Sequence, residues 1–183
     1  MEKNKAAGPT PVVLPPTNAF SLSLWPAPLK VLATCLILTL LTGYGVSLLQ
    51  VFDRSHFDMM KTILYYRGDG SIGDEAIMLP QNYRTMLSIA HVHTLSQPFM
   101  FAFFGLIFAF SRVPNRAKSF FIIMSFAGSL VSNATPWLLR YVSPKMVWLF
   151  PLSQLAIFFS IVVMATVSLW ELWFKHSDIT PPL

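Results

Sequence analysis

Four long apolar stretches limit what this chain can fold into more than any other feature of its sequence. They cover approximately residues 29–52, 86–110, 119–139 and 146–170. A helix of about 20 mostly apolar residues crosses the roughly 30 Å hydrocarbon core of a bilayer, and each stretch reaches that length. The sequence therefore predicts an all-α membrane protein, a four-transmembrane-helix bundle formed by one domain over residues 29–174.

The charged residues agree with a membrane protein and argue against a nucleic-acid partner. Only 11% of the 183 residues are charged, whereas a soluble domain carries about 25%. The net charge of +5 comes from basic residues that flank the apolar stretches, where Lys and Arg anchor transmembrane helices. The single cysteine, Cys35, lies in the first stretch, so an internal disulfide is excluded and we expect a small buried side chain.

Proline-rich and polar segments flank the bundle at both ends. Residues 1–28 contain six prolines, which predicts an extended, Pro-rich cytoplasmic tail without helix. Residues 175–183 form a short C-terminal tail after the last apolar stretch.

The loop after the first stretch contains a short amphipathic segment. Residues 56–67 place Phe57, Met60 and Leu64 on one helical face, which predicts a helix lying in the membrane interface. We expect Ser55 to cap its start and Gly68 to end it, with a turn over residues 68–75.

A short basic loop between the second and third stretches indicates the orientation. It contains Arg112, Arg116 and Lys118 and no acidic residue, and short basic loops remain on the cytoplasmic side. We therefore expect a protein of the cytoplasmic (inner) membrane with both termini in the cytoplasm.

Two histidines begin the apolar part of the second stretch. Residues two apart lie about 200° from each other around a helix, so His91 and His93 point to different faces. His91 begins a stripe of mostly small residues at helical spacing, which are Thr94, Pro98, Ala102, Gly105 and Ala109. Small residues favour close helix packing in membranes. We therefore expect His91 to face the bundle, and His93 to lie with Gln97 on another face.

Polar residues of the third and fourth stretches recur toward the same outer end. Ser125, Ser129, Ser132 and Pro136 follow helical spacing, with Asn133 beside them, and Ser153 and Gln154 follow Pro151. Helical bundles place cofactors between facing helices. The candidate cofactor-binding residues are therefore His91, His93, Gln97, Asn133 and Gln154. The alternative is that these side chains are only interhelical hydrogen-bonding groups.

The chemistry of a bound group stays open at this point. Histidine is a common axial ligand of haem, which suggests haem b, but the other three stretches contain no histidine. A copper or zinc ion is a second alternative, with the metal-ligand set His56, His91 and His93. No phosphate-binding loop, nucleophile elbow or zinc-protease motif is present, so we predict no catalytic residues.

Two segments resemble a known group of proteins. The run His91-Val-His93-Thr-Leu and the later run Trp137-Leu-Leu-Arg-Tyr-Val-Ser-Pro144 are similar to uncharacterised small four-span bacterial inner-membrane proteins with a His-x-His pair at the start of the second span. The resemblance covers roughly residues 85–170. It implies the four-span topology and draws attention to His91 and His93, and it implies no activity. A looser resemblance to small membrane cytochromes implies a haem.

These observations favour a non-catalytic integral membrane accessory or assembly subunit, and an electron-transfer system is one candidate for the assembly that it serves. A haem- or quinone-binding membrane redox protein is the alternative, and a copper or zinc handling protein is the second alternative. The expected partners are the lipid bilayer and other membrane subunits or a second copy of the chain, with no nucleic acid.

Overall fold

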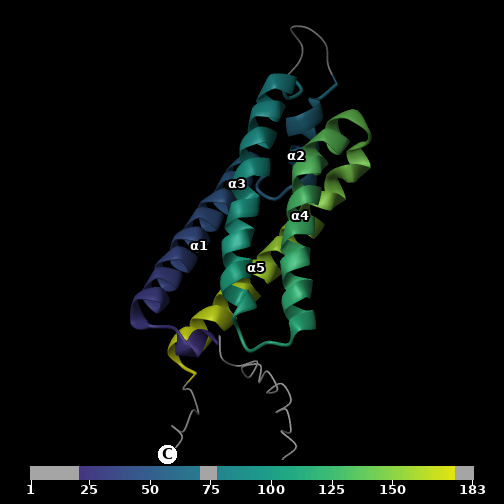
Figure 1. The fold of residues 1–183 in the computed structure, drawn as a ribbon. Helices are drawn as coiled ribbons and strands as arrows, with labels where there is room; N and C mark the ends of the chain where they lie inside the picture. Colours follow the sequence, from purple (N-terminus) through teal and green to yellow (C-terminus); the bar gives the residue numbers. More distant parts are fainter. Residues whose placement is uncertain (1–20, 71–77, 176–183) are drawn as a thin grey trace, which may run out of the picture.

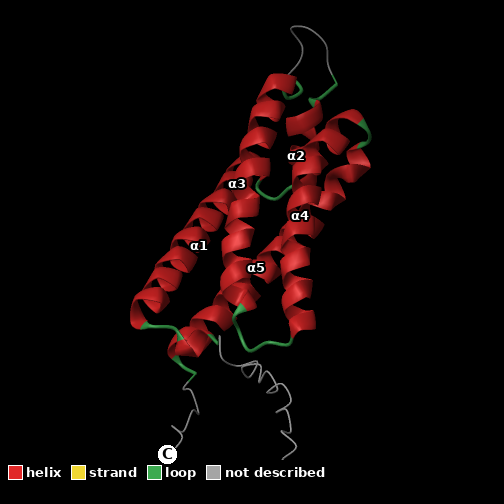
Figure 2. Cartoon of the chain, in the orientation of Figure 1, coloured by secondary structure: helices red, strands yellow, loops and turns green. Residues whose placement is uncertain are grey.

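The structure is a computed structural model that describes residues 21–70 and 78–175, and within these ranges every regular element is helical (Figure 2). Four long helices form the bundle, namely α1 (Ala27–Ser55), α3 (Tyr83–Ala109), α4 (Asn115–Tyr141) and α5 (Leu149–Trp173). A short helix, α2 (Met59–Arg67), follows α1, and two 3-10 turns, η1 (Leu22–Leu24) and η3 (Pro144–Trp148), precede α1 and α5. The predicted four-helix membrane bundle is confirmed.

The four long helices are long and apolar enough to cross a bilayer. They contain 25 to 29 residues, which at 1.5 Å per residue gives lengths of about 38 to 44 Å. At most of their ends the helices run a few residues beyond the apolar stretches, because flanking residues continue the same hydrogen-bonded turns. Helix α5 instead begins three residues later than its stretch, because η3 precedes it. In Figure 1, α3 and α4 run side by side and α1 slants away from α3 toward the bottom of the view.

Large aromatic side chains of α3 fill the middle of the bundle. Phe101, Phe104 and Phe108 are almost completely buried. The ring centroids of Phe101 and Phe126 of α4 lie 5.8 Å apart in an edge-to-face arrangement, which suits the quadrupoles of aromatic rings. Between α4 and α5 the helices approach closely at Gly128, where an added Cβ would lie 2.9 Å from Ile157 Cγ1.

The part of the N-terminal segment that the structure describes is folded against the bundle. Leu22 is fully buried, and its backbone N–H donates to the Phe110 carbonyl at 3.3 Å. Pro28 lies in the first turn of α1, where a proline's missing N–H is not needed. The prediction of an extended tail over residues 1–28 is therefore wrong for residues 21–28, because an apolar side chain anchors them. Residues 1–20 lie outside the described residues.

Helix α2 begins and ends with local capping groups. The predicted cap Ser55 is wrong, since Ser55 is the last residue of α1 and the Asp58 carboxylate accepts from the backbone N–H of Lys61 instead. This hydrogen bond holds the pKa of the Asp58 carboxyl below its ordinary value. Gly68 ends the helix with φ of 75°, as predicted. The predicted turn over residues 68–75 lies mostly outside the described residues.

Two arginines hold α2 against α4. Arg67 at the end of α2 donates to the carbonyls of Leu139 and Arg140 at the end of α4. Arg140 in turn donates to the carbonyl of Tyr66 at 2.9 Å. Each guanidinium thus donates to C-terminal carbonyls that have no partner within their own helix, and it complements the negative end of that helix's dipole.

We expect Arg140→Ala to loosen α2 from the bundle and to lower the free energy of unfolding by about 1 to 2 kcal/mol, because charge-assisted hydrogen bonds are lost. Hydrogen exchange of the α2 amides should accelerate more than that of α3. Arg84→Ala, which changes an exposed arginine at the start of α3, is the control. Unchanged α2 exchange in Arg140→Ala would contradict this role.

Candidate functional site

The two histidines of α3 face in the opposite directions from those that the sequence predicted, because His93 rather than His91 faces the bundle. His91 is exposed on the outside of the bundle, whereas His93 is half-buried and lines two cavities between the helices together with Gln97. Within the predicted small-residue stripe, Gly105 is buried against Ile122, but Thr94 and Ala102 are exposed. The prediction for His91 is wrong because bulky phenylalanines, rather than small residues, form the inward face of α3.

A hydrogen-bonded polar cluster joins α3, α4 and α5. The side-chain carbonyl of Gln97 accepts from the Ser129 hydroxyl at 2.6 Å and from the Asn133 amide at 2.8 Å. On α5, the amide of Gln154 donates to the Ser132 hydroxyl at 3.0 Å. Measured along the axis of α3 from its first residue, Tyr83, His93 lies about 15 Å and Gln97 about 21 Å into the helix, at 1.5 Å per residue. The cluster is therefore well inside the membrane-spanning part of the helices.

Three cavities meet at Gln154, and together we call them the crevice. The first cavity, the mouth, has a volume of about 170 Å³ and lies between α1, α2 and α5. The second, the waist, has a volume of about 100 Å³ and lies at the polar cluster. The third, the chamber, has a volume of about 330 Å³ and lies between α1, α3 and α5. Val51, Tyr65, Tyr66 and Phe150 line both mouth and waist. Ser47, His93 and Gln97 line both waist and chamber.

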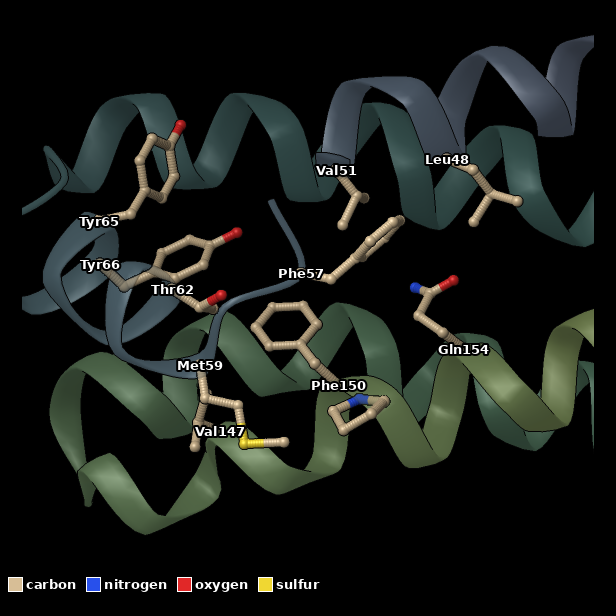
Figure 3. Close-up of a pocket in the computed structure, with 11 residues that line it drawn as sticks. Leu48, Val51, Phe57, Met59, Thr62, Tyr65, Tyr66, Val147, Phe150 and Gln154 are labelled. Atoms are coloured by element: carbon tan, nitrogen blue, oxygen red, sulfur yellow. The ribbon is translucent and has the colours of Figure 1, made fainter. Parts of the chain in front are cut away.

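The mouth is mainly aromatic and apolar (Figure 3). Phe57 and Tyr66 approach from the α2 side, and Phe150 and Gln154 extend toward them from α5. The rings of Tyr66 and Phe150 are stacked with centroids 5.8 Å apart. Phe57 has φ of 59°, a left-handed conformation that is unfavourable for a bulky residue. This turn directs the Phe57 ring into the mouth.

The chamber brings in polar residues that the sequence analysis missed. Tyr44 and Ser47 of α1 and Ser96 of α3 line it together with His93 and Gln97. The signal for α1 is present in the sequence, because Leu40, Tyr44, Ser47 and Val51 follow helical spacing and all line the crevice. Gly43 and Ser96 are exposed chamber residues, so the chamber opens at the surface of the bundle between α1 and α3.

Helix α1 packs on the bundle along its first half, where Ile37 is fully buried and Leu40, Leu41 and Tyr44 pack against the core. Near its start, Thr34 accepts a 2.9 Å hydrogen bond from the indole of Trp173 of α5, and at its far end it packs on α2. Between these points, an added Cβ at Gly43 or Gly45 would meet nothing within 4 Å. These two glycines therefore make no close contact with another of the described helices. Cys35, expected to be buried, is exposed on the outside of α1.

The predicted metal-ligand set does not come together. His56 is the exposed C-terminal cap of α1 with φ of 49°, and His91 is exposed on α3. Among the described residues, no group of three His, Cys, Asp or Glu side chains is placed to hold a metal ion. The set His56, His91 and His93 is wrong because the three side chains lie on different surfaces.

Four membrane-spanning helices around an internal crevice define an integral membrane protein of the helical-bundle class. The chain belongs to the transmembrane helical domain family Aq_1264_TM, which matches residues 56–179. The matched part contains α2, α3, α4 and α5, which supply most of the walls of the crevice. Comparison with curated proteins and with solved structures finds no match.

Proposed function

We propose that this protein is a non-catalytic membrane subunit that holds a lipid-soluble quinone in the crevice between α1, α3, α4 and α5. The observation that carries the proposal is that an aromatic mouth and a mainly apolar chamber with several polar side chains share the residues of the waist, inside the membrane-spanning region. A quinone has a flat ring that packs against aromatic side chains, carbonyl oxygens that accept hydrogen bonds, and an apolar tail. Small-molecule sites combine an apolar lining with a few placed polar groups in the same way.

The dimensions and the exposed edge of the chamber support this class of ligand. Its volume of about 330 Å³ lies at the lower end of the range for small-molecule pockets, which begins near 300 Å³. The chamber reaches the lipid-facing surface at Gly43 and Ser96. An apolar tail can leave the chamber there and remain in the bilayer, so that binding does not require the tail to be buried in protein.

Haem b is less well supported by the same residues. Of the three candidate histidines only His93 lines the crevice, and His56 and His91 are exposed outside it. Met100 also lines the chamber, but it lies on α3 with His93, so the two side chains approach a ligand from one side. Axial ligands of one iron must approach from opposite faces of the haem.

A quinone-holding subunit fits the accessory role in electron transfer that the sequence suggests, because a bound carrier is useful only when a partner exchanges electrons with it. We place the protein in the cytoplasmic membrane with both termini inside. The short connection between α3 and α4 carries Arg112, Arg116 and Lys118 and no acidic residue, and short basic loops remain on the cytoplasmic side.

The direct test is binding of a short-tailed 1,4-naphthoquinone to the purified protein in detergent. Trp137 lines the waist, so a bound quinone should quench tryptophan fluorescence with a saturable dependence on concentration. The control ligand is tetralin with the same tail, which has the ring size without the oxygens. Quenching by the quinone that does not saturate, or equal retention of both compounds in equilibrium dialysis, would refute the proposal.

A further inference from the structure

The waist is lined by residues that extend from one end of the bundle to its middle. Gln81 lines it at the end where α2 lies, two residues before α3 begins, and its backbone N–H donates to the Tyr66 carbonyl of α2. Gln97 also lines the waist, about 21 Å into α3 at 1.5 Å per residue. The waist therefore leads from the end of the bundle, before the apolar stretch begins, to the polar cluster that borders the chamber.

Three amide side chains at the waist use only part of their hydrogen-bonding capacity within the protein. The Gln97 carbonyl accepts from Ser129 and Asn133, which leaves the Gln97 N–H groups. The amide nitrogens of Asn133 and Gln154 donate to their neighbours, which leaves the two carbonyl oxygens. These remaining groups have no partner among the described residues, and they are not among the enclosed unpaired atoms found there. They are therefore accessible to a small molecule in the waist.

Water is the molecule that fits this cavity. Its volume is about 100 Å³, whereas one water needs about 10–15 Å³ and pockets for small organic molecules begin near 300 Å³. The waist thus has room for several waters and not for a quinone ring. The remaining groups of Gln97, Asn133 and Gln154 include donors and acceptors on three helices. A water molecule both donates and accepts, and a buried one bonds two to four polar groups.

We propose that the waist holds ordered water molecules that connect the aqueous phase at the α2 end of the bundle with the chamber, as a path along which protons reach His93. Hydrogen-bonded waters pass protons from one molecule to the next, and an imidazole can take up and release a proton. His93 lines both cavities, so it lies where the path ends. The inference goes beyond the proposed function, because it does not require a quinone in the chamber.

The experiment measures access of silver ions to single cysteines in lipid nanodiscs. Silver ions are close to water in size, bind thiols and do not enter hydrocarbon. The reporters are Ser132→Cys on α4 and Ser47→Cys on α1, both at the waist, in a Cys35→Ala background. The control is Val92→Cys, which is 57% exposed on the lipid side of α3. Val92 and Ser132 both lie about 14 Å from the α2 end of their helices.

Silver should block both reporters at least about a hundredfold faster than Val92→Cys, because an ion is excluded from lipid. The rate is measured as loss of thiols that a maleimide dye can label after unfolding. Reporters that react no faster than Val92→Cys would show a dry waist and refute the proposal. The two reporters lie on different helices, so a folding defect in one leaves the other to decide.

A blocking variant tests the route. Ala90 lines the waist between Gln81 and His93, so Ala90→Leu should slow the reaction of Ser132→Cys by about tenfold or more, since the cavity holds only a few waters. Ala102→Leu, on the exposed side of the same helix, should not slow it. Fast reporters that Ala90→Leu does not slow would refute a path from the α2 end. Quinone binding is measured separately, so its failure and the failure of this path are distinguishable.

Discussion

His93→Ala should reduce the affinity for the short-tailed 1,4-naphthoquinone by about tenfold or more, whereas His91→Ala should leave it unchanged. His93 lines both the waist and the chamber, and His91 is exposed on the outer surface of the same helix. The two variants remove the same chemical group two residues apart, so a general effect on α3 would appear in both. Saturable quenching of the protein's tryptophan fluorescence, to which Trp137 at the waist contributes, measures the affinities.

A third variant separates ligand contact from loss of the polar cluster. Gln97→Leu removes the acceptor of Ser129 and Asn133, so it should weaken both the bundle and quinone binding. His93→Ala should weaken binding with a smaller change in melting temperature. If His91→Ala abolishes binding and His93→Ala does not, the ligand occupies the outer surface of α3 and the crevice is not its site.

Gly128→Leu should lower the free energy of unfolding by about 2 to 3 kcal/mol or prevent folding, because a side chain there has no space. An added Cβ at Gly128 lies 2.9 Å from Ile157 Cγ1 and 3.2 Å from the Ser153 carbonyl oxygen. Because the Ser153 carbonyl belongs to the backbone of α5, it cannot move unless the helix itself moves. The helices must therefore separate, which also strains the hydrogen bond between Ser132 and Gln154.

Two matched variants test this explanation. Ala127→Leu adds similar bulk at the neighbouring exposed position of α4 and should cost little. Gly105→Leu should be intermediate, because its nearest neighbour is the flexible Ile122 side chain at 3.3 Å. Thermal unfolding in detergent, followed by the helical circular dichroism signal, gives the order of stability of the three variants. Equal melting temperatures for Gly128→Leu and Ala127→Leu would contradict the close packing of α4 on α5.

Part of the candidate site was predictable because its residues are polar in apolar surroundings. Gln97, Asn133 and Gln154 stand out in the sequence, and the structure places all three at the waist with His93. Such residues are costly in lipid unless they pair within the bundle, which makes their inward direction predictable. His91 carries the same signal but is exposed, so polarity alone did not identify the inward face. The use of these residues for a ligand remains a prediction.

The sequence by itself determined the four spans, the existence of α2 and its end at Gly68, because these depend on local properties. Apolar length decides what crosses a bilayer, and a glycine with positive φ ends a helix wherever its neighbours lie. Only the tertiary structure decided which side of α3 faces inward, because a span is apolar on every face and lipid accepts Phe99 as readily as the core accepts Phe101. The chamber at Tyr44 likewise depends on how α1 packs on α5 and α2, which no local pattern encodes.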